Sequence, residues 1–138
     1  MALALALIWA ASAPVGNGSP ACDPRVDGAV GDGVAADTIA LQATLDRCVG
    51  GTVRVAPGTY RIGPIALPSR TTLELAAGAT LLASGTAGDY TLPNGQRRAL
   101  VSASDVTNVA IVGAGTIDGA GAPWWEQFRA DTEAGRAP

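Results

Sequence analysis

The chain has 138 residues and a formal net charge of −3, and only 15% of its residues are charged, which is below the share typical of globular proteins. This length allows one domain with a modest core. Every basic side chain is an arginine, and only Arg97 and Arg98 are adjacent, so the sequence lacks the basic cluster of a nucleic-acid-binding protein and no nucleic-acid partner is expected.

The first element is an apolar segment, MALALALIWAASA, which ends in the small residues Ala11-Ser12-Ala13. An apolar run of about ten residues before an A-x-A site is typical of a secretory signal peptide, and a bilayer span needs about 20. We predict a signal peptide and leader over residues 1–21, a secreted or periplasmic protein, and no membrane association after cleavage. The segment lacks a basic n-region and Pro14 follows the A-x-A site, so an uncleaved apolar tail is the alternative.

Cys22 and Cys48 are the two cysteines of the chain, and they flank one predicted helix. In an exported protein such a pair indicates a disulfide, which would close a loop of roughly 27 residues and stabilise the fold by about 3.5 kcal/mol on the chain-entropy model. Metal binding is the alternative, but two cysteines with no histidine fall short of a four-ligand zinc site. We therefore expect neither a metal site nor a cofactor.

The helix is predicted between Asp37, which stands at its N-cap, and Gly50, which follows its last turn. The intervening stretch contains no glycine or proline. Leu41, Leu45 and Cys48 recur at i, i+4 and i+7 and give the helix one apolar face. A single amphipathic helix before a series of strands suggests a lid over the end of a β stack.

A repeat follows the helix, in which a glycine separates an apolar pair from a second short strand. The glycines are Gly58, Gly78 and Gly115, the pairs are Val53 and Val55, Leu73 and Leu75, and Ala110 and Val112, and the second strands are Tyr60–Ile62, Thr80–Leu82 and Thr116–Ile117. The glycine spacings are 20 and 37 residues, and the second falls to 25 if the polar segment 85–96 is an inserted loop. These periods predict a solenoid of short stacked strands.

Two other folds compete for the same residues. Asn94-Gly95 and Asp118-Gly119 are dipeptides typical of hairpin turns, which would make the protein an antiparallel sandwich or barrel. The stretch VAIVGAGTIDG also begins like a dinucleotide-binding unit. There, however, Asp118 occupies a position that needs Gly or Ala, and the glycines and proline that follow interrupt the helix that such a site requires.

Two segments together resemble the N-terminal part of glycoside hydrolase family 28, the polygalacturonases. They are GAVGDGVAADTIALQATLDRCVGGTVRVAPGTY, from Gly28 to Tyr60, and GTIDGAGAPWW, from Gly115 to Trp125. The resemblance implies an all-β fold, a right-handed parallel β-helix of the pectin-lyase type, of which residues 22–138 would be the truncated N-terminal coils, capped by one short α-helix. It also fits a disulfide between Cys22 and Cys48. The implied function is that of a secreted glycoside hydrolase that cleaves α-1,4-galacturonosyl bonds in cell-wall pectin with inversion.

The resemblance stops before the catalytic motifs of the family, which read Asn-Thr-Asp, Asp-Asp, Gly-His-Gly and Arg-Ile-Lys. This chain has no histidine, no lysine and no adjacent Asp pair, and Arg61-Ile62-Gly63 shares only two letters with the last motif. We therefore assign no catalytic residue and predict that the chain alone is inactive. A pectic polysaccharide is the partner expected of the full-length protein, and the fragment is expected to self-associate through its open C-terminal coil.

The remaining candidate residues have structural interpretations. Asp32 and Asp118 each precede a glycine and should shape turns, and Glu74 should face outward from a strand. Trp124 and Trp125 are expected to pack a helix or loop against the coil rather than to stack on sugar rings. The alternative to a hydrolase is a β-helical polysaccharide-binding or structural module, as in phage tailspikes, and GTIDGAGAPWW favours the hydrolase.

Overall fold

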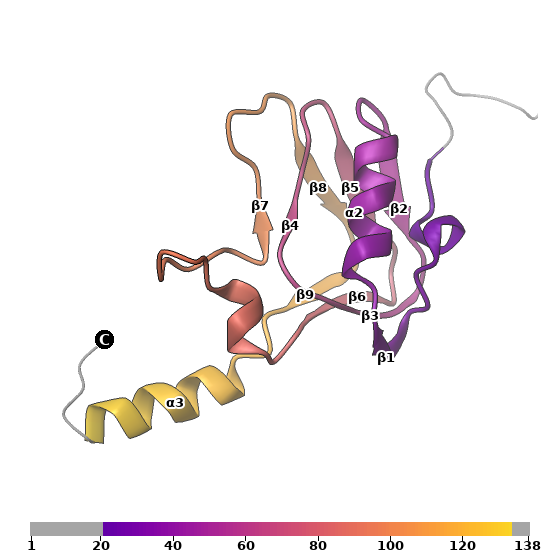
Figure 1. The fold of residues 1–138 in the computed structure, drawn as a ribbon. Helices are drawn as coiled ribbons and strands as arrows, with labels where there is room; N and C mark the ends of the chain where they lie inside the picture. Colours follow the sequence, from indigo (N-terminus) through magenta and orange to yellow (C-terminus); the bar gives the residue numbers. More distant parts are fainter. Residues whose placement is uncertain (1–20, 134–138) are drawn as a thin grey trace, which may run out of the picture.

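The computed structural model describes residues 21–133, which form three sheets of parallel strands (Figure 1). The sheet orders are β1-β3-β6-β9, β2-β5-β8 and β4-β7. The strands are β1 (Asp32–Ala36), β2 (Thr52–Val55), β3 (Gly58–Ile62), β4 (Ile65–Ala66), β5 (Thr72–Leu75), β6 (Ala79–Ala83), β7 (Val101–Ser102), β8 (Ala110–Gly113) and β9 (Thr116–Asp118). The antiparallel alternative is therefore wrong, because every pairing between these strands is parallel.

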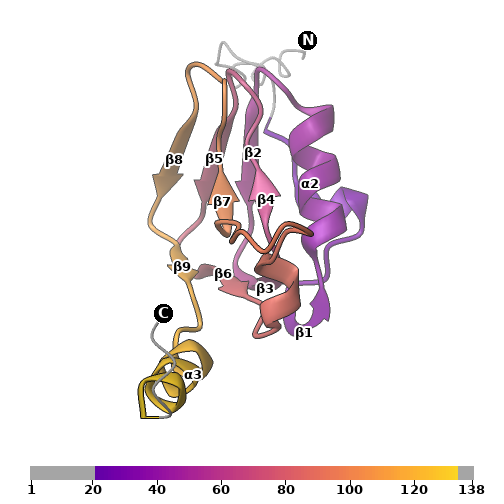
Figure 2. The same ribbon diagram turned by 60° about the vertical axis from the view of Figure 1, so that its left-hand side comes forward.

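The chain visits the three sheets in turn and so builds coils stacked on one another. One coil contains β2, β3 and β4, the next contains β5, β6 and β7, and the last contains β8 and β9 (Figure 2). Thr52 pairs with Thr72, which pairs in turn with Ala110. This architecture is the solenoid of short stacked strands that the repeat predicted, in the parallel β-helix form that the family resemblance implied.

The core lies inside the coils and is filled by alternate residues of each strand. Val53, Val55, Leu73 and Leu75 are at most 3% exposed, and Tyr60, Ile62 and Leu81 are at most 1% exposed. Because the register places Val53 against Leu73 and Val55 against Leu75, like side chains stack directly on one another through the helix. The apolar pairs predicted for the first two coils are therefore confirmed.

The predicted register of the third coil is wrong by one residue. Ile111 pairs with Leu73 and Gly113 pairs with Leu75, so the inward-facing positions are those two and not Ala110 and Val112. Ala110, Ile111 and Val112 are all apolar, so the alternation of apolar and polar residues does not show which of them face inward. Glycine occupies the second inward position. The second strand of this coil, which begins at Thr116, lies where it was predicted.

A helix, α2 (Thr38–Arg47), covers the N-terminal end of the stack (Figure 2). Leu41, Leu45 and Cys48 of its predicted apolar face are 1%, 0% and 9% exposed, which confirms the amphipathic pattern. A short 3-10 helix, η1 (Pro24–Asp27), precedes β1. The end of the stack that comes first in the chain is thus closed.

Asp37 stands at the N-cap of α2, but the prediction that it caps the helix is wrong for its side chain. The carboxylate accepts hydrogen bonds from the backbone N–H groups of Val30 and Gly31, at 2.8 and 3.0 Å. Asp37 is 1% exposed, so it holds the preceding loop to the start of the helix from inside the protein.

Residues 84–100 leave the coil between β6 and β7, and we refer to them as the excursion. They contain a 3-10 helix, η2 (Ala87–Tyr90), and an isolated antiparallel bridge between Thr91 and Arg97. The segment predicted as an inserted loop, 85–96, lies within the excursion. Asn94 and Gly95 therefore form a turn inside this local hairpin and do not organise the fold.

After β9 the chain forms a second helix, α3 (Ala122–Glu133), which extends beyond the stack of coils (Figures 1 and 2). The helix includes the polar residues from Asp131 to Glu133. Trp125 is 64% exposed, so the prediction that it packs against the coil is wrong. The same prediction included Trp124, whose side chain lies outside what the structure describes.

No helix among residues 21–133 is long and apolar enough to cross a membrane. The predicted signal peptide and leader cover residues 1–21. Residues 1–20 lie outside the described part of the chain, and Ala21 is described and exposed.

Candidate functional site

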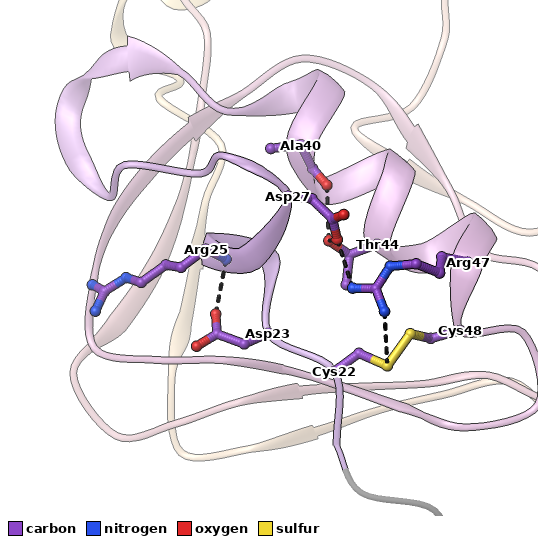
Figure 3. A network of polar contacts seen from close by, with 8 residues as sticks. All are labelled: Cys22, Asp23, Arg25, Asp27, Ala40, Thr44, Arg47 and Cys48. Carbon is purple, nitrogen blue, oxygen red and sulfur yellow. Dashed lines mark hydrogen bonds and ion pairs between the residues drawn. A yellow bond between two sulfur atoms is a disulfide. The ribbon is translucent and has the colours of Figure 1, made fainter.

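The N-terminal cap holds a network of polar contacts around the Asp27 carboxylate (Figure 3). Arg47 of α2 forms an ion pair with it at 2.7 Å, and the Thr44 hydroxyl donates to the same oxygen at 2.5 Å. Cys22 and Cys48 form a disulfide with Cα atoms 6.6 Å apart, and Arg47 lies 4.0 Å from the Cys22 sulfur. The network and the predicted disulfide together fasten α2 to the chain segment that precedes β1.

The pKa shifts of this region have structural causes. The hydrogen bond from Arg47, followed by that from Thr44, lowers the pKa of Asp27, and the same pairing raises the pKa of Arg47. Backbone N–H groups of Ala35 and Val34 lower the pKa of Asp32. A general acid that works near neutral pH needs a raised carboxyl pKa. The pKa values of Asp27 and Asp32 are lowered instead, so neither carboxyl is tuned for that role.

Other acidic residues shape turns and strands as the sequence predicted. Asp32 accepts hydrogen bonds from two N–H groups downstream, both at 2.9 Å, and Asp118 accepts one from Ala120, also at 2.9 Å. Glu74 points outward from β5 and pairs with Arg54 at 3.4 Å across the β2–β5 register. Among the described residues, no cluster of three or more His, Cys, Asp or Glu side chains could hold a metal ion.

The Arg61-Ile62-Gly63 sequence serves the coil. Arg61 donates to the Val34 carbonyl at 3.3 Å, and Ile62 is fully buried. The Gly63 N–H donates to the hydroxyl of Thr38 at 2.8 Å. These contacts join the first complete coil to the cap, so the resemblance to a substrate-binding motif has no counterpart in the geometry.

Several surface cavities accompany the coils formed by residues 21–133. One of about 590 Å³ lies beside the disulfide and is lined in part by Arg47 and Val49. A second, of about 350 Å³, lies at the C-terminal face and is lined mainly by small and apolar residues, including Leu67, Val109 and Ile111. A third, of about 220 Å³, is the corner cavity, and it is lined by Ala83, Tyr90, Arg97, Arg98, Leu100 and Gly119.

The corner cavity joins three segments that are separate in the sequence. Ala83 ends β6, the two arginines and Tyr90 belong to the excursion, and Gly119 follows β9. From the sequence, Arg97 and Arg98 were evident only as two adjacent arginines. The cavity was not predicted, because no local pattern indicates that Gly119 lines the same cavity as the arginines. The role of Gln42 of α2 was not predicted either; its amide exchanges two hydrogen bonds with Ala66 of β4 at 2.9 and 2.8 Å.

Comparison with known proteins agrees with this architecture. The family described as "Glycosyl hydrolases family 28" matches residues 48–137. The chain is 34% identical over 125 residues to the exo-poly-alpha-D-galacturonosidase of Dickeya chrysanthemi, an alignment that covers 78% of this chain and 20% of that protein. The chain therefore spans about a fifth of the length of the curated relative that it matches.

Two solved structures share the fold. The family 28 exopolygalacturonase of Yersinia enterocolitica aligns with a TM-score of 0.66 and 34% identity, over 73% of this chain and 21% of that one. The hyperthermoactive exopolygalacturonase of Thermotoga maritima aligns with a TM-score of 0.65 and 28% identity, over 72% and 25%. The right-handed parallel β-helix is thereby confirmed, and the chain belongs to glycosyl hydrolase family 28.

Proposed function

We propose that this chain forms the N-terminal coils of a secreted polygalacturonase-like hydrolase, which cleaves α-1,4-galacturonosyl bonds of pectin with inversion. The observation that carries the proposal is the 34% identity, over 125 residues, to an exo-poly-alpha-D-galacturonosidase. An inverting hydrolase needs one carboxylic acid and one carboxylate base about 6.5 to 9.5 Å apart. The sequence from Met1 to Pro138 lacks the family's motifs for these groups, so they belong to coils that this chain does not contain.

The role of the described residues in this proposal is to start and close the β-helix. The cap, the disulfide and the first stacked coils give later coils a template of parallel strands on which to pair. Export is supported by the apolar segment before Ala11-Ser12-Ala13 and by the two cysteines, because disulfides persist in oxidising compartments. A pectic polysaccharide is the proposed substrate of the whole protein.

The test compares residues 22–138 with a longer protein that includes the coding sequence downstream of Pro138. We expect the longer protein to release reducing ends from polygalacturonate and to give first products of the β configuration by NMR. Residues 22–138 should release none above a buffer control. Activity of the short protein would contradict the proposed location of the catalytic groups, and a longer protein inactive on all pectic polymers would overturn the proposed function.

A further inference from the structure

The excursion is fastened to the coil at both of its ends. The Ser84 N–H donates to the Ile62 carbonyl at 2.8 Å, and the Ile65 N–H donates to the Leu100 carbonyl at 2.8 Å. Residues 84–100 therefore leave and rejoin the β-helix at positions set by strand pairing. An insertion held in this way can present side chains in a fixed arrangement, as ligand-binding loops on rigid scaffolds do.

Contacts inside the excursion set the positions of Tyr90 and Arg98. The Arg98 N–H donates to the Tyr90 carbonyl at 2.7 Å, which ties the two residues together. Tyr90 is 7% exposed, and its hydroxyl donates to the Ser84 carbonyl at 3.1 Å. The hydroxyl of Tyr90 is thus bonded to the coil, and Tyr90 is one of the residues that line the corner cavity.

The charged side chains that line the corner cavity are basic, in an otherwise acidic protein. Both charged lining residues are arginines, whereas the chain carries a formal net charge of −3. Two aspartates precede lining residues in the sequence: Asp89 precedes Tyr90 and accepts a hydrogen bond from the hydroxyl of Ser84, and Asp118 precedes Gly119 and accepts one from the backbone N–H of Ala120. Arg98 is exposed, so its guanidinium is accessible to a ligand from solvent.

This combination selects a small carboxylate that carries an apolar face. Guanidinium groups bind carboxylates through two parallel hydrogen bonds, and aromatic rings pack against the C–H face of a sugar. A volume of about 220 Å³ lies below the range of about 300 to 1,000 Å³ that drug-sized ligands occupy. A volume of this size has room for one sugar ring.

We propose that the corner cavity binds the carboxylate of a single hexuronate unit, with Arg98 as its charge partner and the Tyr90 ring as its packing surface. The choice of a hexuronate, rather than another small carboxylate, rests on the proposed function. The site lies on the outer corner of the second coil, and it uses residues that this chain contains.

The test is ligand-observed saturation-transfer NMR with residues 22–138, a measurement that tolerates association of the protein. Galacturonate and galactose are titrated separately as observed probes, and inorganic phosphate, which has no C–H proton to observe, is titrated as a competitor of galacturonate. We expect galacturonate to bind at least tenfold more tightly than galactose, which lacks the carboxylate, and more tightly than phosphate. Equal binding of galacturonate and galactose would overturn the proposal, and phosphate binding as tight as galacturonate would show a general anion site instead.

Arg98→Gln is the matched variant, and Arg70→Gln, at an exposed arginine on another part of the coil, is its control. Arg98→Gln should weaken galacturonate binding at least tenfold with an unchanged circular dichroism spectrum, and Arg70→Gln should bind as the parent does. Unaltered binding by Arg98→Gln would contradict the assignment. Activity of the longer protein on polygalacturonate, without galacturonate binding at this cavity, would overturn this inference alone.

Discussion

At the scale of single residues, the side-chain amide of Gln42 forms the backbone hydrogen bonds that a neighbouring strand would otherwise form with β4. Successive residues of a strand direct their hydrogen-bonding groups to opposite sides, and Ile65 and Leu67 donate toward the next coil. The N–H and C=O of Ala66 therefore face α2, where they meet the oxygen and nitrogen of the Gln42 amide at 2.8 and 2.9 Å. One side-chain amide thus replaces the peptide group that a further coil would supply.

Gln42→Ala should remove both hydrogen bonds and leave the edge of β4 to water. We expect the free energy of unfolding to fall by about 1 kcal/mol, and hydrogen exchange at the Ala66 amide to accelerate. Urea denaturation and exchange measured by NMR check the two effects. Gln96→Ala, in an exposed turn of the excursion, is the control, and an unchanged exchange rate at Ala66 in Gln42→Ala would show that the amide contact has no protective role.

Asp27 makes the stability of the folded protein depend on pH, and the sign of this dependence follows from the lowered pKa of Asp27. An unfolded aspartate has a pKa of about 4, and the folded value lies below it, so between the two the unfolded state binds more protons. The stabilisation is fully present above about pH 4 and is lost as the pH falls through the folded pKa. We expect Asp27→Asn to lower stability at neutral pH and to flatten the acid decline.

The measurement for Asp27 is the urea midpoint between pH 7 and pH 3 for the parent and for the variant. Asp105→Asn, at an exposed aspartate far along the chain, is the matched control and should keep the acid decline of the parent. If Asp27→Asn and Asp105→Asn gave the same profile, the Arg47 and Thr44 contacts would contribute nothing to the pH dependence.

The sequence predicted the position of residues such as Asp32, Asp118 and Leu45, because their roles depend on neighbours within a few positions. It did not predict the bonds of Asp37 and Gln42. Both residues satisfy backbone groups that are exposed only once the coil and the helix have come together. The corner cavity was missed for the same reason, since Gly119 reaches the excursion only through the stacking of β9 on β6.

At the scale of elements, Gly115 allows the chain just before β9 to pack closely against the turn between β5 and β6 of the preceding coil. A Cβ atom at this position would lie 2.6 Å from the Leu75 Cβ and 2.7 Å from the Ala79 carbonyl oxygen. Both atoms belong to the coil below, so the contact cannot be relieved by rotating a long side chain. The glycine that opens the GTIDG sequence is therefore required by packing between coils.

Gly115→Ala should lower the free energy of unfolding by about 1–3 kcal/mol, the usual cost of overpacking. Gly119→Ala is the control, because no atom lies within 4 Å of the Cβ it would add. Thermal or urea denaturation of the two variants checks the difference. Equal stability of the two would mean that the last coil moves freely away from the coil beneath it.

Elements were predicted well where a periodic pattern stood between clear breaks, as in α2 and the first two coils. The third coil was predicted one residue out of register because its strand is apolar at consecutive positions. α3 was underestimated because its residues share no apolar face that the sequence makes evident. Register and helix length there depend on tertiary contacts that a local pattern does not contain.

At the scale of the whole molecule, the two ends of the β-helix differ. The N-terminal end is closed by α2, the disulfide and the Asp27 network. At the other end β8 and β9 are the last strands of their sheets among residues 21–133, and Ile111, Val112 and Ile117 are 43%, 46% and 41% exposed. An edge of this kind presents unpaired backbone groups together with apolar surface, which is a template for pairing with another chain.

We therefore expect a protein that consists of residues 22–138 to self-associate through β8 and β9, as light scattering at micromolar concentration would reveal. Val112→Lys tests the route, because Val112 is in register with outward-facing Glu74 and a lysine there leaves the core intact while it blocks edge pairing. Val34→Lys makes the same change at the capped end and should associate as the parent does. Of the two variants, only Val112→Lys should become monomeric. A longer protein that supplies the following coils should also be monomeric. A parent that remained a monodisperse monomer would show that its last coil is already covered, and association of Val112→Lys equal to that of Val34→Lys would place the contact elsewhere on the surface.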